Sequence, residues 1–218
     1  ILQAIPNPRL LLSPLLTQEA VLSSRIEGTQ ASLEDVLRFE ANPKEPIGDV
    51  ALADIQEIIN YREALETAVE ALKTRRLDQA LVCDLHRILL SGSRGMDRGP
   101  GCVRTIQNFI GRDAHIEHAI YVPPAPEDVP GALGDWEAYL QREEKDVLVQ
   151  LSVLKAQFEL IHPFCDGNGR IGRMLVPLIL YEKGLIGSPM FYISAYLERN
   201  RPVYYERLLA VSRDGDWN

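Results

Sequence analysis

The sequence predicts an all-α fold, mainly helical, that carries one β-hairpin. Apolar residues recur at spacings of three and four through most of the 218-residue chain, which is typical of amphipathic helices. Only one segment has the composition of paired strands. A hydrophobic content of 46% is ample for a globular core at this length.

The first predicted helix lies near the N-terminus. Thr17 is a good N-cap residue and Gly28 a natural residue after a helix end, so a helix is expected at about 17–27. Glu27 then stands at the negative end of the helix dipole. That position costs a carboxylate roughly 0.3–1 kcal/mol unless a cation compensates.

Five further helices follow from the same periodicity, at about 48–73, 79–90, 127–143, 146–161 and 169–184. Asp78 is the expected N-cap of the second of these. The helix at 146–161 delivers His162 at its C-terminal end. Pro163 must end that helix, because the residue before a proline disfavours the α conformation.

The hairpin is expected between residues 103–110 and 119–122, which flank a polar stretch. An isolated hairpin is rarely stable, so it must pack on the rest of the domain. His115 and His118 lie in its loop. We interpret them as solvated surface residues, because no cysteine or third histidine is near them in the sequence.

Composition narrows the class of partner and the compartment. A net charge of -8 argues against a general nucleic-acid surface, so a protein partner is favoured. Three scattered cysteines suit a reducing cytoplasm with buried thiols and no structural zinc. No signal peptide or membrane span is recognisable, and we expect a cytoplasmic protein that does not contact membranes.

Residues 162–173 form the most informative motif, His-Pro-Phe-Cys-Asp-Gly-Asn-Gly-Arg-Ile-Gly-Arg. A histidine can take a proton from a hydroxyl near neutral pH, and an aspartate can hold a divalent cation against phosphate oxygens. The glycine turn can aim backbone N–H groups at an anion where the next helix begins. Arg170 and Arg173 lie three residues apart on one helix face. Together these features predict a phosphate-binding site.

Two other interpretations of this motif fail. A calcium loop that starts at Asp166 would need an oxygen ligand where Arg170 stands and a glutamate where Pro177 stands. A Walker-type phosphate loop would need a glycine followed by lysine and then serine or threonine, which the chain lacks.

The motif resembles the signature of Fic-domain proteins, His-x-Phe-x-(Asp/Glu)-Gly-Asn-Gly-Arg-x-x-Arg, and every defined position is filled. Members with this signature are adenylyltransferases, which move AMP from ATP to a Ser, Thr or Tyr hydroxyl of a target protein. The resemblance implies that His162 is the general base and that Phe164 anchors the loop in the core. It assigns Mg²⁺ to Asp166, the α- and β-phosphates to Gly167, Asn168, Gly169 and Arg170, and the γ-phosphate to Arg173.

A second, shorter motif also resembles this family. Ser23-x-x-x-Glu27-Gly28 is similar to the inhibitory pattern (Ser/Thr)-x-x-x-Glu-(Gly/Asn) of bacterial members. The resemblance implies that Glu27 pairs with Arg173 and takes the place of the γ-phosphate, so that the chain inhibits itself. The simpler alternative is an exposed glutamate at a helix end.

The resemblance also covers the walls of the site. It implies that the hairpin, at about 106–123, is a flap that docks the target, with Ala119, Ile120 and Tyr121 near the nucleotide. It places Tyr204 and Tyr205, and Asn200 as a weaker candidate, beside the adenine.

The expected domains are an N-terminal segment with the inhibitory helix (1–45), a catalytic domain (46–213) and the start of a C-terminal part (214–218). Partners are ATP and a target protein, of which the chain itself is one candidate; a homodimer stays open. Alternatives to AMP transfer also stay open. They are net removal of AMP, another Fic-type phosphotransfer, and a catalytically silent regulatory or interaction module.

Overall fold

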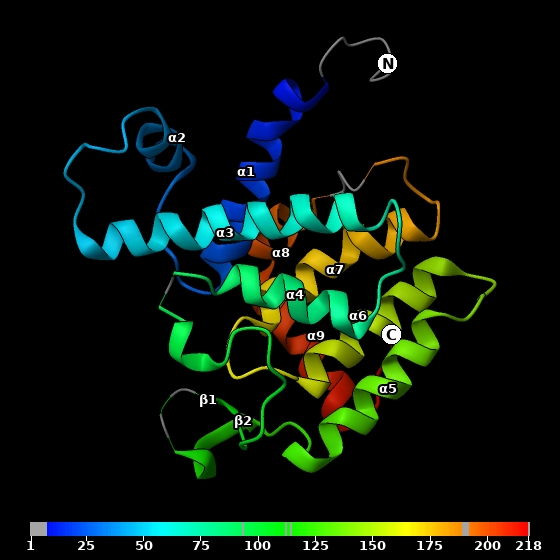
Figure 1. Ribbon diagram of the computed structural model, residues 1–218. Coiled ribbons are helices and arrows are strands. Elements are labelled where there is room, and N and C mark those ends of the chain that lie inside the picture. The colour runs from blue at the N-terminus through cyan, green and yellow to red at the C-terminus, as the bar shows by residue number, and fades with distance from the viewer. Residues whose placement is uncertain (1–7, 93, 112, 114, 189–191, 218) are drawn as a thin grey trace.

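The computed structural model describes residues 8–92, 94–111, 113, 115–188 and 192–217 (Figure 1). The helices are α1 (Pro8–Ile26), α2 (Leu33–Ala41), α3 (Asp49–Ala71), α4 (Gln79–Leu89), α5 (Val129–Leu140), α6 (Val147–Ile161), α7 (Asn168–Glu182), α8 (Ser194–Arg199) and α9 (Arg201–Asp214). The strands are β1 (Ile110–Gly111) and β2 (Ala119–Tyr121). The predicted all-α class with a single hairpin is therefore confirmed.

Helix α7 lies at the centre of the bundle, and the other elements are arranged around it. Every residue from Arg170 to Leu180 is buried. Figure 1 shows α3 crossing in front of α1 and α7, with α4 alongside it, and these helices are in contact. The hairpin lies at the opposite side of the bundle from α3 (Figure 1). A helix that is apolar on nearly all sides must be covered on nearly all sides, which explains the central place of α7.

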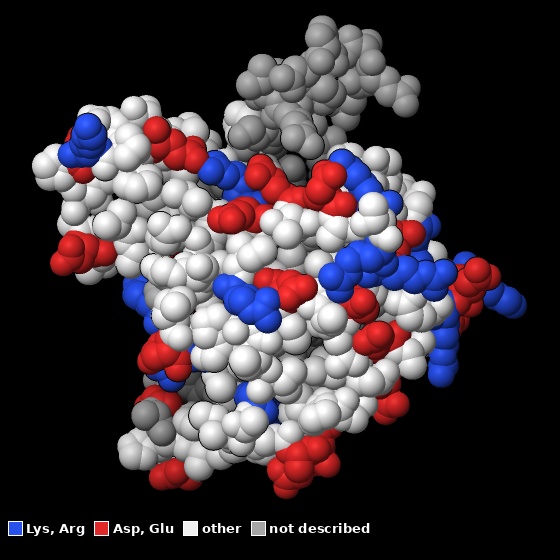
Figure 2. Space-filling view, viewed as in Figure 1, with Lys and Arg blue, Asp and Glu red and all other residues white. Residues whose placement is uncertain are grey.

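No helix in the described ranges has the length and apolar character needed to cross a bilayer. On the face drawn in Figure 2, lysine and arginine side chains are interspersed with aspartate and glutamate. That face has no continuous basic surface of the kind that binds nucleic-acid backbones.

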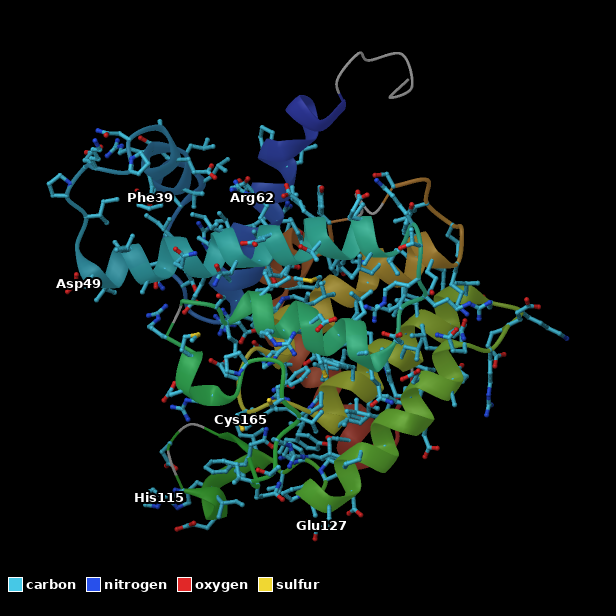
Figure 3. The ribbon with its side chains drawn as sticks, viewed as in Figure 1. Phe39, Asp49, Arg62, His115, Glu127 and Cys165 are labelled. Atoms are coloured by element: carbon cyan, nitrogen blue, oxygen red, sulfur yellow. The ribbon has the colours of Figure 1, made fainter. Side chains whose placement is uncertain are left out.

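The N-terminal helix is longer than predicted. α1 begins at Pro8, and Thr17 is a buried interior residue whose hydroxyl accepts a hydrogen bond from Arg62 at 3.2 Å (Figure 3). The prediction that Thr17 caps this helix is wrong, because packing against α3 outweighs the local capping preference. The predicted end is confirmed to within one residue: α1 stops at Ile26, and Gly28 has a φ of 109°, which favours glycine.

The hairpin is present, but its first strand is much shorter than predicted. Only β1 pairs with β2, in antiparallel register and with an irregularity between its two residues. The predicted strand at 103–110 is therefore wrong except at its last residue.

The segment at 103–109 binds the loop between α6 and α7 in place of a neighbouring strand. The Arg104 amide donates to the Pro163 carbonyl at 2.9 Å, and the Asn108 side chain donates to the Phe164 carbonyl at 2.9 Å. Backbone groups that already have partners in the loop need no strand partner. These bonds place the hairpin beside the 162–173 motif.

The other five predicted helices agree with α3, α4, α5, α6 and α7 to within about three residues, whereas no bounds were predicted for α8 and α9. The Asp78 cap is confirmed by its 2.7 Å hydrogen bond from the Leu81 amide. Helix α2 was not predicted. Its signal was a capping box, in which Ser32 accepts from the Asp35 amide at 3.2 Å and Asp35 accepts from the Ser32 amide at 2.8 Å.

The two tryptophans offer a direct measure of core packing. Trp136 on α5 is 1% exposed, packs against Phe158 with the two rings tilted by 57°, and donates its indole N–H to the Leu154 carbonyl at 2.9 Å. Trp136→Ala is expected to lower the free energy of unfolding by about 3–5 kcal/mol, through the cavity it leaves and the carbonyl it orphans. Trp217, which is 55% exposed, is the control. Trp217→Ala should change the free energy of unfolding, measured by urea denaturation, by less than about 0.5 kcal/mol. Equal effects of the two substitutions would contradict the packing described.

Candidate active site

The loop between α6 and α7 holds the motif in an unusual backbone conformation. α6 ends at Ile161, and His162 follows with φ and ψ of 49° and 59° in the left-handed region. In the described part of the chain no other non-glycine residue has a positive φ. Such a conformation costs on the order of 1–3 kcal/mol and persists only where neighbours hold it. Arg104 is one such neighbour, since its Nε donates to the His162 carbonyl at 2.9 Å.

The imidazole of His162 is oriented as a proton acceptor. Nδ1 lies 3.3 Å from the Glu159 carbonyl oxygen, which can only accept, so Nδ1 carries the ring proton and Nε2 keeps its lone pair. Burial lowers the pKa of His162, which keeps the ring neutral near pH 7. The side chain lines a cavity of about 690 Å³ between α6, α7, α9 and the hairpin. A neutral histidine with a free ring nitrogen in a cavity is a competent general base.

Asn168 closes the glycine turn from within. Its side chain is buried, accepts from the Phe164 amide at 2.9 Å and donates to the Phe164 carbonyl at 2.7 Å. The Asn168 side-chain amide is thus used inside the loop. Any contact from the turn at Gly167–Gly169 to a ligand would therefore come from its backbone groups. Gly167, with a φ of 76°, is the N-cap of α7, where free N–H groups and the helix dipole favour an anion.

His86 supports this loop from α4, and this role was not predicted from the sequence. The ring stacks on Phe164 with centroids 3.8 Å apart. Its Nδ1 accepts from the Gly101 amide at 2.9 Å, so Nε2 carries the proton and donates to the Asp166 carbonyl at 3.0 Å. Burial lowers the pKa of His86 to about 4. A neutral, buried histidine thus fixes the backbone that bears the acidic residue.

Arg170 is held between two carboxylates. Its Nη1 donates to Glu57 Oε2 at 3.2 Å, and its Nη2 lies 3.6 Å from Asp166 Oδ1. The Nε atom of this buried side chain has no hydrogen-bond partner among the described residues. An arginine with an unused buried donor beside an anion-binding turn can accept a further ligand.

The guanidinium of Arg173 is bound by Ser23 of α1 and by Glu27, the residue that follows this helix. The guanidinium is buried, donates from Nε to Ser23 Oγ and from Nη2 to the Ser23 carbonyl, both at 2.9 Å, and donates from Nη2 to Glu27 Oε1 at 2.6 Å. Burial opposes ionisation of Glu27, but the charge and hydrogen bond of Arg173 outweigh it and lower the pKa of Glu27. Both groups are therefore charged at neutral pH. The predicted residues Ser23 and Glu27 do meet Arg173.

The Glu27 carboxylate lies over the start of α7. A Cβ atom built on Gly169 would collide with Glu27 Oε1, and it would stand 3.0 Å from Arg173 Nη1. Only glycine leaves room for an anion this close to the backbone. The carboxylate of Glu27 thus occupies the place that the turn and Arg173 provide for a negatively charged ligand.

The hairpin forms one wall of the cavity. Ile120 and Tyr121 line it, and the Tyr121 hydroxyl donates to the Leu160 carbonyl at 2.7 Å. Ala119 pairs with Gly111 in the two-stranded sheet. His115 is exposed, and Figure 3 shows it at the outer end of the hairpin, away from Cys165 in the motif loop.

Helix α9 forms the other wall. Tyr204 and Tyr205 both line the cavity, as does Arg201, which lies over the Tyr205 ring at 5.7 Å and was not predicted. Tyr204 is fixed by a 2.8 Å hydrogen bond from Lys155 Nζ. Asn200 is not among the residues that line the cavity, and its amide donates to the Tyr196 carbonyl at 2.8 Å.

Asp166 does not form a metal site made of protein side chains alone, but it can bind a cation that phosphate oxygens also bind. Its Oδ1 accepts from the Gly167 amide at 2.6 Å, and Oδ2 has no hydrogen-bond partner within the described ranges. No group of three or more His, Cys, Asp or Glu side chains that could hold a metal occurs in those ranges. A divalent cation here would need phosphate oxygens and water as its other ligands, which is the usual way in which Mg²⁺ binds.

These features define a class of site. A histidine base, a glycine turn at a helix N-terminus and two buried arginines surround one cavity, which fits phosphate-group chemistry on a nucleotide. Family comparison agrees: the Fic/DOC family N-terminal model matches residues 1–70, and the Fic/DOC family model matches residues 76–180. The chain belongs to the Fic/DOC family.

Curated relatives are distant in sequence. A protein of Aquifex aeolicus named "Probable protein adenylyltransferase" is 28% identical over 89% of this chain and 54% of its own length. The protein adenylyltransferase Fic of Nematostella vectensis is 26% identical over 74% of this chain and 36% of its own length. This chain thus spans about half of the first relative and about a third of the second.

Solved structures share the fold. A Fic family protein from Desulfovibrio desulfuricans superposes with a TM-score of 0.78 at 23% identity, over 99% of this chain and 62% of that one. A Fic domain containing signaling protein from Bacteroides thetaiotaomicron gives 0.75 at 22% identity, over 95% of this chain and 76% of that one. The helical architecture is therefore that of Fic proteins.

The buried His86 predicts a specific acid sensitivity of the fold. Its pKa is about 4 in the folded chain against an ordinary value of 6.5, so below pH 6.5 the unfolded chain binds a proton that the folded chain refuses. Between pH 6.5 and 4 the wild type should lose about 3 kcal/mol more unfolding free energy than His86→Gln. His115→Gln, at an exposed histidine, is the control and should keep the wild-type slope. Parallel curves for wild type and His86→Gln in urea titrations would refute the role given to His86.

Proposed function

We propose that this chain transfers AMP from Mg·ATP to a Ser, Thr or Tyr hydroxyl of a target protein, and that Glu27 restrains the reaction. The observation that carries the proposal is the position of His162. His162, whose Nδ1 is used by the Glu159 carbonyl so that Nε2 keeps its lone pair, lines a cavity that is also lined by Gly169 and Arg173. Relatives named protein adenylyltransferase support the same reaction.

The nucleotide is proposed to lie with its phosphates at the turn and its base toward α9. A cavity of about 690 Å³ is in the range that small-molecule ligands occupy. Arg170 and Arg173 neutralise phosphate oxygens, and Tyr204 and Tyr205 offer rings for the adenine. Asp166 would hold Mg²⁺, which supplies further charge neutralisation on the phosphates when it is bound.

The reaction then needs one proton transfer and one displacement at phosphorus. His162 Nε2 takes the proton of the target hydroxyl, and that oxygen bonds to the α-phosphorus. The bond from the α-phosphorus to the bridging oxygen breaks, and pyrophosphate leaves with the negative charge. Positioning and charge stabilisation account for most catalysis of this kind, so the arginines matter as much as the base.

A protein target is proposed to lie along the hairpin. Five aliphatic side chains there are large and exposed, namely Ile106, Ile110, Ile116, Ile120 and Val122. A short hairpin beside a catalytic cavity can pair with an extended segment through its backbone, and exposed aliphatic groups add contact area. This arrangement would bring a target hydroxyl toward His162.

The brake is proposed to act by competition for Arg173. With Glu27 on Arg173 and over Gly169, the terminal phosphate of ATP has no cation and no space at that point. ATP could then bind only in a pose that misplaces the α-phosphorus. Displacement of the carboxylate restores the site.

Removal of the Glu27 carboxylate tests the brake. Glu27→Gly should raise labelling of the chain or of a target from α-labelled ATP by roughly 10- to 100-fold, the equivalent of one charge-assisted hydrogen bond. Glu27→Gln, which keeps the volume and loses the charge, should give a smaller rise. Glu34→Gln, at an exposed glutamate of α2, should leave labelling unchanged. No increase with Glu27→Gly would rule the brake out.

Removal of the base tests the reaction. In the Glu27→Gly background, His162→Ala should reduce labelling by roughly 100-fold or more, because a general base contributes at least that much. Binding of Mg·ATP, followed as protection against thermal unfolding, should stay the same and shows that the site is intact. Label should come from the α position and not from the γ position of ATP. Substantial residual activity would remove His162 from its role, and γ-label transfer would indicate phosphate transfer instead.

A further inference from the structure

Two buried carboxylates on α3 connect the segment that follows α1 with Arg170 on α7. Asp54 and Glu57 lie one helical turn apart and are only 3% and 7% exposed. Carboxylates removed from water need charged or hydrogen-bonding partners. Their partners come from the segment after α1, from Arg94 and from Arg170 on α7. Figure 1 shows how this is possible, since α3 crosses both α1 and α7.

Glu57 bridges the end of the inhibitory helix and the phosphate arginine. The same oxygen, Oε2, accepts from the Thr29 hydroxyl at 3.1 Å and from Arg170 Nη1 at 3.2 Å. The other oxygen, Oε1, accepts from Arg94 Nε at 3.0 Å. Thr29 is itself buried, so its hydroxyl has no bulk water as an alternative partner.

Asp54 fixes the next residue of the same segment. Its Oδ2 accepts from the Gln30 amide at 2.7 Å, and its Oδ1 accepts from Arg94 Nη2 at 2.5 Å. Arg94 thus joins both carboxylates. Two successive residues after Gly28 are tied to α3, one by its side chain and one by its backbone.

This attachment bears on Glu27 because only Gly28 separates it from Thr29. The turn after α1 is partly held by the helix itself, because the Gly28 amide donates to the Arg25 carbonyl at 3.0 Å and the Thr29 amide donates to the Ser24 carbonyl at 3.2 Å. Gly28 has a positive φ, which lets the chain leave the helix at this point. The bonds from the Thr29 hydroxyl to Glu57 and from the Gln30 amide to Asp54 then tie this turn, and with it Glu27, to α3.

We propose that Thr29, Asp54, Glu57 and Arg94 form a clasp that holds Glu27 over Gly169, with Thr29 as the positioning residue. The clasp rests on the proposed function, since it controls the same site. It adds a second place at which the brake can be released, about one turn beyond the Glu27–Arg173 pair. It also makes Glu57 common to both arginines, because it contacts Arg170 directly and Arg173 through α1.

Thr29 and Asp54 are suitable test positions because neither touches a residue proposed to bind ATP. Thr29→Val removes the hydroxyl and keeps the branched shape, and Thr29→Ser restores the hydroxyl. Asp54→Asn weakens the second attachment if the first variant folds poorly. Thr67→Val, at an exposed threonine of α3, is the matched control.

The first measurement is hydrogen exchange over residues 24–31. Loss of one hydrogen bond to a charged group is expected to speed local exchange roughly 10-fold in Thr29→Val. Thr29→Ser and Thr67→Val should match the wild type. Unchanged exchange in both Thr29→Val and Asp54→Asn would overturn the clasp, whatever the enzyme does.

The second measurement is labelling from α-labelled ATP in two backgrounds. In the otherwise intact chain, Thr29→Val should raise labelling roughly 3- to 10-fold, because part of the restraint on Glu27 is lost. In the Glu27→Gly background it should have no effect, since the carboxylate it positions is gone. A purely structural role would lower labelling in both backgrounds and would overturn the inference.

The two proposals fail in different ways. If Glu27→Gly raises labelling and Thr29→Val, with faster exchange, does not, the clasp has no control over the brake and this inference is wrong. If Glu27→Gly itself leaves labelling unchanged, the brake is wrong and the regulatory role of the clasp falls with it.

Discussion

The buried charge of Arg173 is the constraint on which the site depends. A guanidinium in the centre of a helical bundle must be matched by acceptors, because an uncompensated buried charge costs several kcal/mol. Within the described residues, α1 supplies all of its hydrogen-bond acceptors, from Ser23 and Glu27. The N-terminal helix is therefore bound to the domain by electrostatic need as well as by apolar packing, and any anion that replaces Glu27 must meet the same need.

The two arginines of the motif have different counterions. Arg170 is paired with Glu57 of α3, whereas Arg173 is paired with Glu27, the residue that follows α1. Both pairs join α7 to the N-terminal quarter of the chain. The carboxylate on Arg170 is deeply buried and anchored at both oxygens, so it belongs to the scaffold. The carboxylate on Arg173 follows the end of a helix, lies beside a glycine and lines the cavity, which is the position that the proposed exchange for a ligand requires.

Local features of the chain could be predicted from the sequence, and distant contacts could not. Periodicity located the long helices, Pro163 located the end of α6, and the motif brought His162, Gly169 and Arg173 to one site. The length of α1 was missed because Thr17 has the character of an N-cap residue, although it lies inside the helix and accepts a hydrogen bond from Arg62 of α3. The side chains that support the motif were missed because they are distant from it in the sequence. His86 contacts Asp166 across 80 residues, and Glu57 contacts Arg170 across 113.

The bare backbone at Gly169 has a consequence for how such a site can change. The missing side chain there makes room for the Glu27 carboxylate, and in the proposed reaction it makes room for phosphate oxygens as well. A methyl group at this position would expel either occupant, so restraint and turnover would be lost together. Residues 27–30 are proposed to act in the restraint only and not in turnover. Substitutions in that short segment would therefore alter the proposed restraint alone, whereas a side chain at position 169 would disturb both restraint and turnover.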